Sequence, residues 1–206
     1  MAKNIGYNKQ RAPDACFFDV GEKEGLMRIG VFLSSRMGKT DAYRKLTEEL
    51  GRWLVRNGHE LVYGGENYGL MAVLADTVLA EGGRAAGVIP NLSPMKENAH
   101  PGLQEHHYVR SMAERKELMI RLADAFIALP GGIGTLDEFS EVLCLNAIGA
   151  LDKPLVLLGT GGYYEPFRAV RDKILAEQMA DGSSFERLLI TEDLEEAGRF
   201  LTRAKT

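Results

Sequence analysis

Cysteine is scarce in this chain of 206 residues, which contains only Cys16 and Cys144. One lies in a polar segment and the other inside an apolar helical pattern, so a disulfide framework is not indicated and a reducing cytoplasm fits. Long hydrophobic runs are missing too: no stretch approaches the roughly 20 apolar residues that span a bilayer, and residues 1–14 lack an apolar signal segment. We therefore expect a cytoplasmic protein with no membrane partner.

An excess of positive charge is also absent. The chain has 25 lysines and arginines against 29 aspartates and glutamates, which gives a formal net charge of −4. A nucleic-acid polymer is therefore not expected as a partner, because a polyphosphate backbone is normally met by a basic surface. A single phosphate needs only a local site, so a nucleotide remains compatible with this composition.

Apolar runs of strand length alternate with helical patterns along most of the chain. Residues 1–27 come first and show no sustained period, so we expect an amino-terminal extension there. The expected strands are 29–33, 61–63, 85–89, 125–129, 155–158 and 188–190, and the expected helices are 41–57, 70–81, 111–123, 134–147, 164–179 and one from 193. This alternation predicts one α/β domain over residues 28–206: a doubly wound parallel sheet in a three-layer sandwich. The polar segment 91–107 is expected to be a long loop.

The glycine-rich segment PGGIGT, residues 130–135, is the sharpest motif. Ligands of such sheets bind at the carboxyl ends of the strands, and this segment joins an expected strand to an expected helix. Its three glycines would leave backbone N–H groups exposed at the positive end of a helix dipole, an arrangement that binds phosphate. Thr135 adds a hydroxyl donor, and Glu138 lies one turn further along. The alternative is a tight turn in which Thr135 and Glu138 only cap the helix.

Two familiar nucleotide motifs are absent. The chain has no GxxxxGK[ST], and no GxGxxG follows the first expected strand, so neither an NTPase nor a standard dinucleotide dehydrogenase is supported. The four histidines match no usual zinc spacing, so we expect no metal site.

Arg115 and Lys116 form a second candidate constellation, in the segment SMAERKELM. The apolar side of this expected helix is made by Met112, Leu118 and Met119 with Leu122, so both cations are expected to lie off the core stripe. Arg115 would then be able to reach a loop at the edge of the sheet. The alternative is an ordinary solvated charged face.

The ordered motifs YGGENYGLM, IP, MAERK, DAFIALPGGIGTLDE and KPLVLL followed by GYY resemble the LOG family over residues 29–167. These proteins are cytokinin riboside 5′-monophosphate phosphoribohydrolases, often labelled lysine decarboxylase-like. The resemblance implies a homodimer with a Rossmann-like fold that releases free base and ribose 5-phosphate from a nucleoside monophosphate without a metal or redox cofactor. No pyridoxal-binding lysine context supports the decarboxylase label.

The resemblance also assigns residues. The family's catalytic pair falls on Arg115 and Glu138, a substrate-contacting acid falls on Glu97, and Lys116 would assist with the phosphate. Further substrate contacts fall on Ser35, Gly64, Gly65, Met112, Pro130, Gly131, Gly132, Gly134 and Thr135. A carboxylate such as Glu138 can stabilise the positive charge that builds on ribose as an N-glycosidic bond breaks, or position water. Arg115 suits phosphate or sugar oxygens but is a poor proton donor.

Two loops depart from the family pattern. FLSSR replaces FCGSS, which puts Leu33, Ser34 and Arg36 at Cys, Gly and Ser positions, and GGENYGLMA replaces GGGxxGLMG, with Glu66 at the third glycine and Ala72 at the last. These loops are expected to border the ligand, so the preferred base is left open. Glu66 either contacts a base or ribose hydroxyl, or is a surface turn residue.

The leading hypothesis is hydrolysis of the N-glycosidic bond of a nucleoside 5′-monophosphate, either AMP or a cytokinin riboside monophosphate. The main alternative is a nucleotide or phosphorylated-cofactor binding protein without catalysis on the same fold, which the altered loops keep open. A purely structural oligomerisation module would leave the glycine loops and the acid unexplained.

Overall fold

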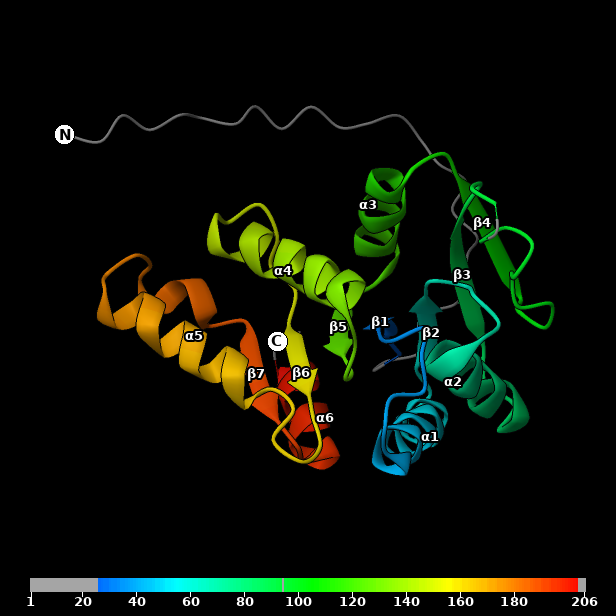
Figure 1. Ribbon diagram of the computed structural model, residues 1–206, viewed down its shortest axis with the longest axis horizontal. Coiled ribbons are helices and arrows are strands. Elements are labelled where there is room, and N and C mark those ends of the chain that lie inside the picture. Colours follow the sequence, from blue (N-terminus) through cyan, green and yellow to red (C-terminus); the bar gives the residue numbers. More distant parts are fainter. Residues whose placement is uncertain (1–25, 94, 204–206) are drawn as a thin grey trace.

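The computed structural model describes residues 26–93 and 95–203 and contains one seven-stranded sheet (Figure 1). The strands are β1 (Arg28–Phe32), β2 (Glu60–Tyr63), β3 (Ala85–Pro90), β4 (Glu105–Val109), β5 (Ala125–Ala128), β6 (Leu155–Leu158) and β7 (Leu188–Thr191). The helices are α1 (Asp41–Arg56), α2 (Gly69–Ala80), α3 (Met112–Leu122), α4 (Ile133–Ala147), α5 (Glu165–Ala176) and α6 (Leu194–Arg203), with a 3-10 turn η1 (Gly182–Phe185). All strand pairs are parallel, in the order β4-β3-β2-β1-β5-β6-β7.

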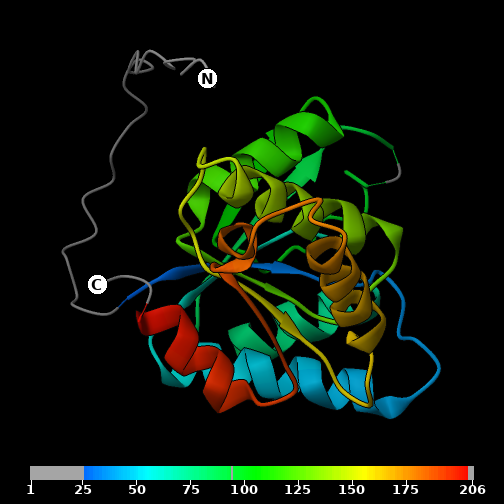
Figure 2. The same cartoon turned by 90° about the vertical axis from the view of Figure 1, so that its left-hand side faces the viewer.

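Helices cover both faces of the sheet. Alternate residues of each buried strand point to opposite faces, so Ile29 and Val31 join one apolar core while Phe32 and Phe126 join the other. In Figure 2, α1, α2 and α6 lie on one side of the sheet, and α3, α4 and α5 lie on the other. The predicted doubly wound, three-layer α/β fold is confirmed.

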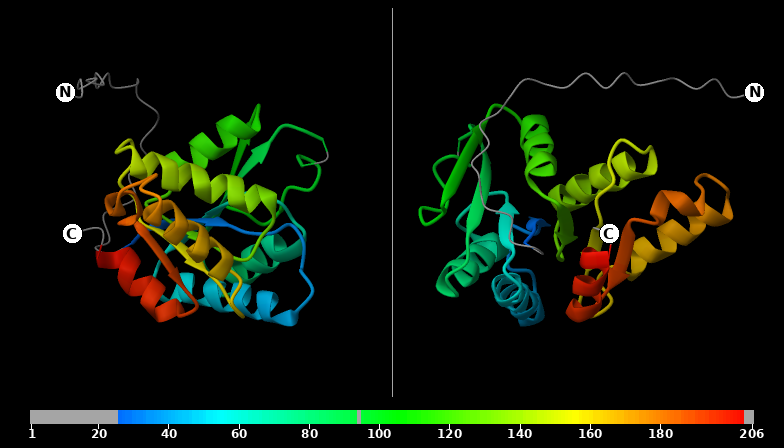
Figure 3. Two further views of the ribbon diagram at one scale, coloured as in Figure 1. Left: turned by 60° about the vertical axis from the view of Figure 1, so that its left-hand side comes forward. Right: turned by 180° about the vertical axis from the view of Figure 1, so that it is seen from behind.

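The strand order reverses direction at β1. The chain runs outward from β1 to β4 at one edge, crosses back through α3, and continues with β5 on the other side of β1. Open α/β sheets bind their ligands at the carboxyl ends of the strands where the order reverses, which here are β1 and β5. Viewed from behind in Figure 3, α3 and α4 lie next to each other on the same side of the sheet.

One strand differs from the sequence prediction. Residues 91–107 were expected to be a loop, but the segment from Glu105 to Val109 forms β4, which pairs with β3 at the edge of the sheet. The prediction was wrong there because an edge strand needs little apolar character: only Val109 is buried, while His106 and Tyr108 are exposed. The predicted extension over residues 1–27 falls, up to residue 25, outside the described residues.

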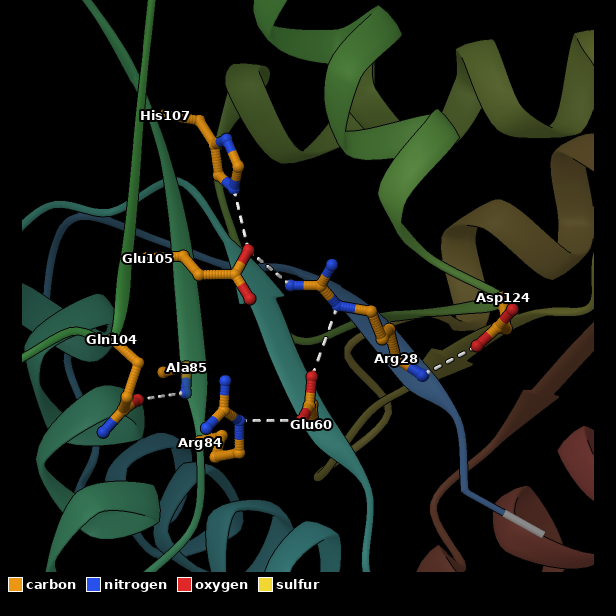
Figure 4. Close-up of polar contacts among 8 residues, drawn as sticks. All are labelled: Arg28, Glu60, Arg84, Ala85, Gln104, Glu105, His107 and Asp124. Atoms are coloured by element: carbon orange, nitrogen blue, oxygen red, sulfur yellow. Dashed lines mark hydrogen bonds and ion pairs between the residues drawn. The ribbon is translucent and has the colours of Figure 1, made fainter. Parts of the chain in front are cut away.

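Ion pairs tie the amino ends of three strands together (Figure 4). The guanidinium group of Arg28 lies 2.9 Å from the Glu105 carboxylate and 3.4 Å from that of Glu60. Glu60 also pairs with Arg84 at 2.8 Å, and Nε2 of His107 lies 2.9 Å from Glu105. This network lies at the amino ends of the strands, on the side of the sheet opposite their carboxyl ends. Nε2 of His107 takes part in this network through its contact with Glu105.

Within the described part of the chain, no helix has both the length and the apolar character needed to cross a bilayer.

Candidate active site

The glycine loop leads directly from β5 into α4. Gly132 is the N-cap residue of α4, no side chain caps the helix, and its first turn carries no acidic residue. A Cβ atom built on Gly132 or Gly134 would meet no heavy atom within 4 Å, so both positions are open. The first amide groups of a helix have no partners inside the helix. The loop can therefore present N–H donors and the positive end of a helix dipole to an anion.

Neighbouring side chains hold this loop in shape. A Cβ atom on Gly131 would stand 2.0 Å from Oγ1 of Thr135, so the buried threonine packs directly on the glycine. The hydroxyl group of Tyr163 donates a hydrogen bond to the carbonyl oxygen of Gly131, and that of Tyr164 donates to Leu129 at 2.7 Å. Two tyrosines that precede α5 thus fix the backbone on which the site depends.

Arg115 crosses from α3 to the carboxyl ends of β2 and β3. It is 4% exposed, and its Nε donates a hydrogen bond to the carbonyl oxygen of Val88 at 3.2 Å. A Cβ atom on Gly64 would stand 1.9 Å from its Nη2, so the glycine makes room for the guanidinium group. The expectation that Arg115 lies off the buried stripe of its helix was wrong, because Arg115 and Met119 are the buried residues of α3.

Glu138 projects from α4 toward this arginine. The carboxyl group is buried, and its Oε1 lies 3.4 Å from Nη1 of Arg115. Burial raises the pKa of Glu138 to about 7, an effect that Arg115 opposes and that the charges of Asp137 and Glu66 reinforce. The group can therefore gain or lose a proton close to neutral pH, which suits a group that must act on water.

Glu66 is also buried, although its loop was open to interpretation as a surface turn. It is 2% exposed, and one of its oxygens, Oε1, has no hydrogen-bond partner among the described residues. The segment that leads to His100 covers it: Glu66 forms an isolated antiparallel bridge with Ala99, and the N–H of His100 donates to the carbonyl oxygen of Gly65 at 2.8 Å. The surface-turn interpretation was wrong.

Tyr68 joins this group and was not predicted. Burial, followed by the interaction with the Glu66 carboxylate, raises the pKa of its hydroxyl group, while the charge of Arg115 lowers it. Tyr68 therefore lies within electrostatic reach of both charged side chains. Its position two residues after Glu66 in the unusual GGENYG loop was the signal that could have identified it.

Two predicted residues contact neighbours other than the glycine loop. The ammonium group of Lys116 lies 2.9 Å from Asp137 and 2.6 Å from Glu141, and these two carboxylates raise its pKa. Glu97 is exposed and accepts a hydrogen bond from the Ser93 hydroxyl group at 2.9 Å. Of these two, Lys116 lies nearer the site, since its partner Asp137 adjoins Glu138.

The remaining predicted residues follow the ends of β1, β2 and β5 or begin α3. Gly65 has a φ of +79°, and a Cβ atom there would stand 2.4 Å from Ile89. The carbonyl oxygen of Ser35 would stand 2.1 Å from a Cβ atom on Gly69, so the loop after β1 packs on the start of α2. Pro130 is buried at the end of β5, and Met112 begins α3 half-buried.

No cluster of three or more histidine, cysteine, aspartate or glutamate side chains suited to a metal ion occurs among residues 26–93 and 95–203. His100 and His106 are engaged in other contacts: Nε2 of His100 lies 3.0 Å from Asp76, and Nε2 of His106 lies 2.8 Å from the carbonyl oxygen of His100.

Solved structures of low sequence identity share the fold. A molybdenum cofactor binding protein from Rippkaea orientalis is 21% identical and superposes with a TM-score of 0.65, covering 87% of this chain and 97% of its own. The molybdenum cofactor carrier protein of Chlamydomonas reinhardtii is 19% identical with a TM-score of 0.62, covering 86% and 97%. At such identities the likeness concerns the fold alone.

Sequence relatives are much closer. The chain is 41% identical over 170 residues to a cytokinin riboside 5′-monophosphate phosphoribohydrolase of Rhodococcoides fascians, covering 82% of this chain and 86% of that protein. It is 44% identical over 150 residues to a probable enzyme of the same name from Oryza sativa subsp. japonica, covering 73% and 67%. A family model described as "Possible lysine decarboxylase" matches residues 71–201, which is more than half of the chain. On its motifs, its relatives and this match, the chain belongs to the LOG family.

Proposed function

We propose that this protein hydrolyses the N-glycosidic bond of a nucleoside 5′-monophosphate, giving free base and ribose 5-phosphate. The observation that carries the proposal is the buried pair of Arg115 and Glu138, 3.4 Å apart, beside the open glycine loop that begins α4. The activity named for the relatives from Rhodococcoides fascians and rice is the same reaction.

The phosphate would bind at the start of α4. Glu138 lies four residues after Gly134, which is about 6 Å along a helix axis. A substrate anchored by its 5′-phosphate at the loop would thus extend its ribose toward the carboxyl group. The dipole of α4 and the amide groups of its first turn supply the attraction, and Thr135 contributes a hydroxyl group beside Gly131.

Glu138 would act on the ribose and on water. As the bond between C1′ and the base nitrogen breaks, the base leaves with the bonding electron pair and positive charge builds on the sugar ring. The ionised carboxylate stabilises that charge and accepts a proton from the water molecule that adds to C1′. The departing base takes up a proton from solvent. A pKa of about 7 suits this proton transfer near neutral pH.

Arg115 would hold the reacting groups in place. Its contacts with Val88 and Glu138 fix the guanidinium group, and its burial strengthens its field at the site. Because an arginine keeps its charge at all accessible pH values, we assign it to binding substrate oxygens and orienting Glu138, and not to general acid catalysis.

AMP and cytokinin riboside monophosphates are the proposed substrates. The reaction as written uses water and these side chains, with no redox group or metal ion taking part. The decisive experiment incubates the protein with AMP, other purine and pyrimidine monophosphates and isopentenyladenosine monophosphate, and measures free base by chromatography. We expect base and ribose 5-phosphate in equal amounts from at least one substrate. Tight nucleotide binding without base release would favour the non-catalytic alternative instead.

We also propose that the protein is a cytoplasmic homodimer. The resemblance to the LOG family implies the homodimer, and we place its surface near Ile148, which is 69% exposed at the carboxyl end of α4. Light scattering at assay concentration should give twice the monomer mass, and a monomer would contradict this part of the proposal.

A further inference from the structure

Glu66 is a buried carboxylate that the protein leaves incompletely bonded. It is 2% exposed, yet Oε1 accepts no hydrogen bond from any described residue. Leaving a buried polar group without a partner destabilises the protein, and more so when the group is charged. Such a group in a ligand site is therefore a candidate acceptor for a donor that the ligand brings.

The surroundings of Glu66 place it inside the candidate active site. Its charge is felt by Glu138 on α4 and by Tyr68 at the start of α2. Tyr68 in turn feels the charge of Arg115. Gly64, two residues before Glu66, packs directly against the guanidinium group of Arg115. Glu66 therefore belongs to the loop that contacts the Arg115 and Glu138 pair.

A carboxylate at this position needs a hydrogen-bond donor, because an ionised carboxylate only accepts. On an adenine base, the ring nitrogens N3 and N7 nearest the sugar are acceptors, and the N6 amino donor lies at the far side of the ring. On the ribose, the 2′-hydroxyl group is attached to the carbon next to C1′ and offers a donor at the required place. The sugar therefore fits Glu66 better than the base does.

We propose that Glu66 accepts a hydrogen bond from the ribose 2′-hydroxyl group and makes the enzyme selective for ribonucleotides over 2′-deoxyribonucleotides. This inference rests on the proposed nucleotide hydrolysis. Hydrogen bonds to the equivalent hydroxyl group strengthen in the transition state of glycoside hydrolysis, as positive charge develops on the ring. The contact should therefore increase kcat for ribonucleotides, and not only their binding.

The test compares kcat/KM for AMP and 2′-deoxy-AMP in wild type, Glu66→Gly and Glu66→Gln. Glu66→Gly should reduce the preference for AMP by roughly tenfold or more, the worth of a charged hydrogen bond, mainly by slowing AMP turnover. Glu66→Gln keeps the shape and one acceptor oxygen, so its preference should fall between those of wild type and Glu66→Gly. Asn67→Ala is the matched control in the same loop, since Asn67 is exposed and only its backbone N–H contacts the Asn98 carbonyl oxygen; it should keep the wild-type preference.

Each alternative has its own signature. An unchanged ratio of AMP to 2′-deoxy-AMP in a folded Glu66→Gly or Glu66→Gln protein would overturn the inference. So would a collapse of the ratio of AMP to IMP with no change at the sugar, because Glu66 would then contact the base. If wild type releases no base from any nucleotide, the proposed function fails, and calorimetric Kd values for AMP and 2′-deoxy-AMP decide the role of Glu66 by the same comparison.

Discussion

Gly64 and Arg115 fit against each other at the carboxyl end of β2. A methyl group on Gly64 would stand 3.1 Å from Cζ of Arg115 and 1.9 Å from its Nη2, and the second distance is closer than real contacts come. Gly64 is not among the glycines with positive φ, so the absent side chain, and not backbone freedom, is what this position requires. The second glycine of the YGGE sequence is different, since Gly65 does have a positive φ.

The Gly64→Ala variant should therefore act through Arg115. The added methyl group displaces the guanidinium group from Val88 and Glu138, and we expect kcat/KM for AMP to fall by about 100-fold, as for a catalytic group misplaced by about 1 Å. Steady-state kinetics of Gly64→Ala, Arg115→Ala and the double variant test this. The double variant should be no slower than Arg115→Ala; additive losses would show that Gly64 acts separately.

Activity should rise with pH through the titration of Glu138. The reaction needs the ionised carboxylate, and burial raises its pKa to about 7, so kcat/KM should increase between pH 5 and 8 with an apparent pKa near 7. A profile of kcat/KM for AMP measures this. If kcat/KM is constant from pH 5 to pH 8, the ionisation of Glu138 does not control the reaction rate.

The same shift makes Glu138 a pH-dependent cost to stability. A carboxyl group whose pKa rises from 4.5 in the unfolded chain to about 7 in the folded protein favours folding fully below pH 4.5, and this contribution is lost as the pH rises through 7. Glu138→Gln should thus stabilise the protein relative to wild type at pH 8 more than at pH 5, by on the order of 3 kcal/mol. Urea unfolding at both values measures the difference.

Glu117→Gln provides the control for this stability prediction. Glu117 lies on α3 with a side chain that is 69% exposed and pairs only with Arg121 in an (i, i+4) contact. Its replacement should change the free energy of unfolding by a similar small amount at pH 5 and pH 8. If the free energy of unfolding of the two variants changes equally with pH, the burial of Glu138 is not the cause of the pH dependence.

Alanine substitutions at two loop glycines should have different effects, one on substrate binding and the other on protein stability. Gly132→Ala adds a methyl group into open space at a φ of −95°, so it should leave the melting temperature nearly unchanged but hinder the approach of a phosphate and raise KM for AMP by roughly tenfold. Gly131→Ala should lower the melting temperature, because its Cβ atom would stand 2.0 Å from Oγ1 of Thr135.

Gly182→Ala is the control for these loop variants. Gly182 begins η1, where an added Cβ atom also meets nothing within 4 Å. The neighbouring Ser183 lines a shallow hollow with Asn146, at the carboxyl end of α4 and away from the loop. Gly182→Ala should match wild type in KM. If the KM of Gly132→Ala for AMP also equals that of wild type, the proposed phosphate-binding role of the loop is contradicted.

Much of the fold was predictable because its strands are short, apolar and separated by helical patterns. Six of the seven strands follow from buried runs such as Ile29–Leu33 and Leu155–Leu158. The strand β4 did not, because its sequence EHHYV lies at the edge of the sheet, where its polar residues remain exposed or contact other polar side chains. A hydrophobic pattern identifies elements that are buried, and an edge strand such as β4 buries few of its residues.

The candidate site was predictable in its parts and less so in its geometry. The motifs indicated both Arg115 and Glu138. An arginine on an amphipathic helix is normally predicted to be exposed, however, and only the fold shows that Arg115 is buried beside Gly64. The burial of Glu66 depends on the segment around Ala99, more than 30 residues away in sequence. Sequence spacing alone carries no such information.

The most direct test of the proposed chemistry is a time course of AMP hydrolysis by wild type and Glu138→Gln, with AMP binding measured by calorimetry on both proteins. Wild type should release adenine and ribose 5-phosphate in equal amounts. Glu138→Gln should bind AMP with a similar Kd and turn over about 100- to 1,000-fold more slowly. Absence of adenine from the wild-type reaction, or equal rates in the two proteins, would contradict the account.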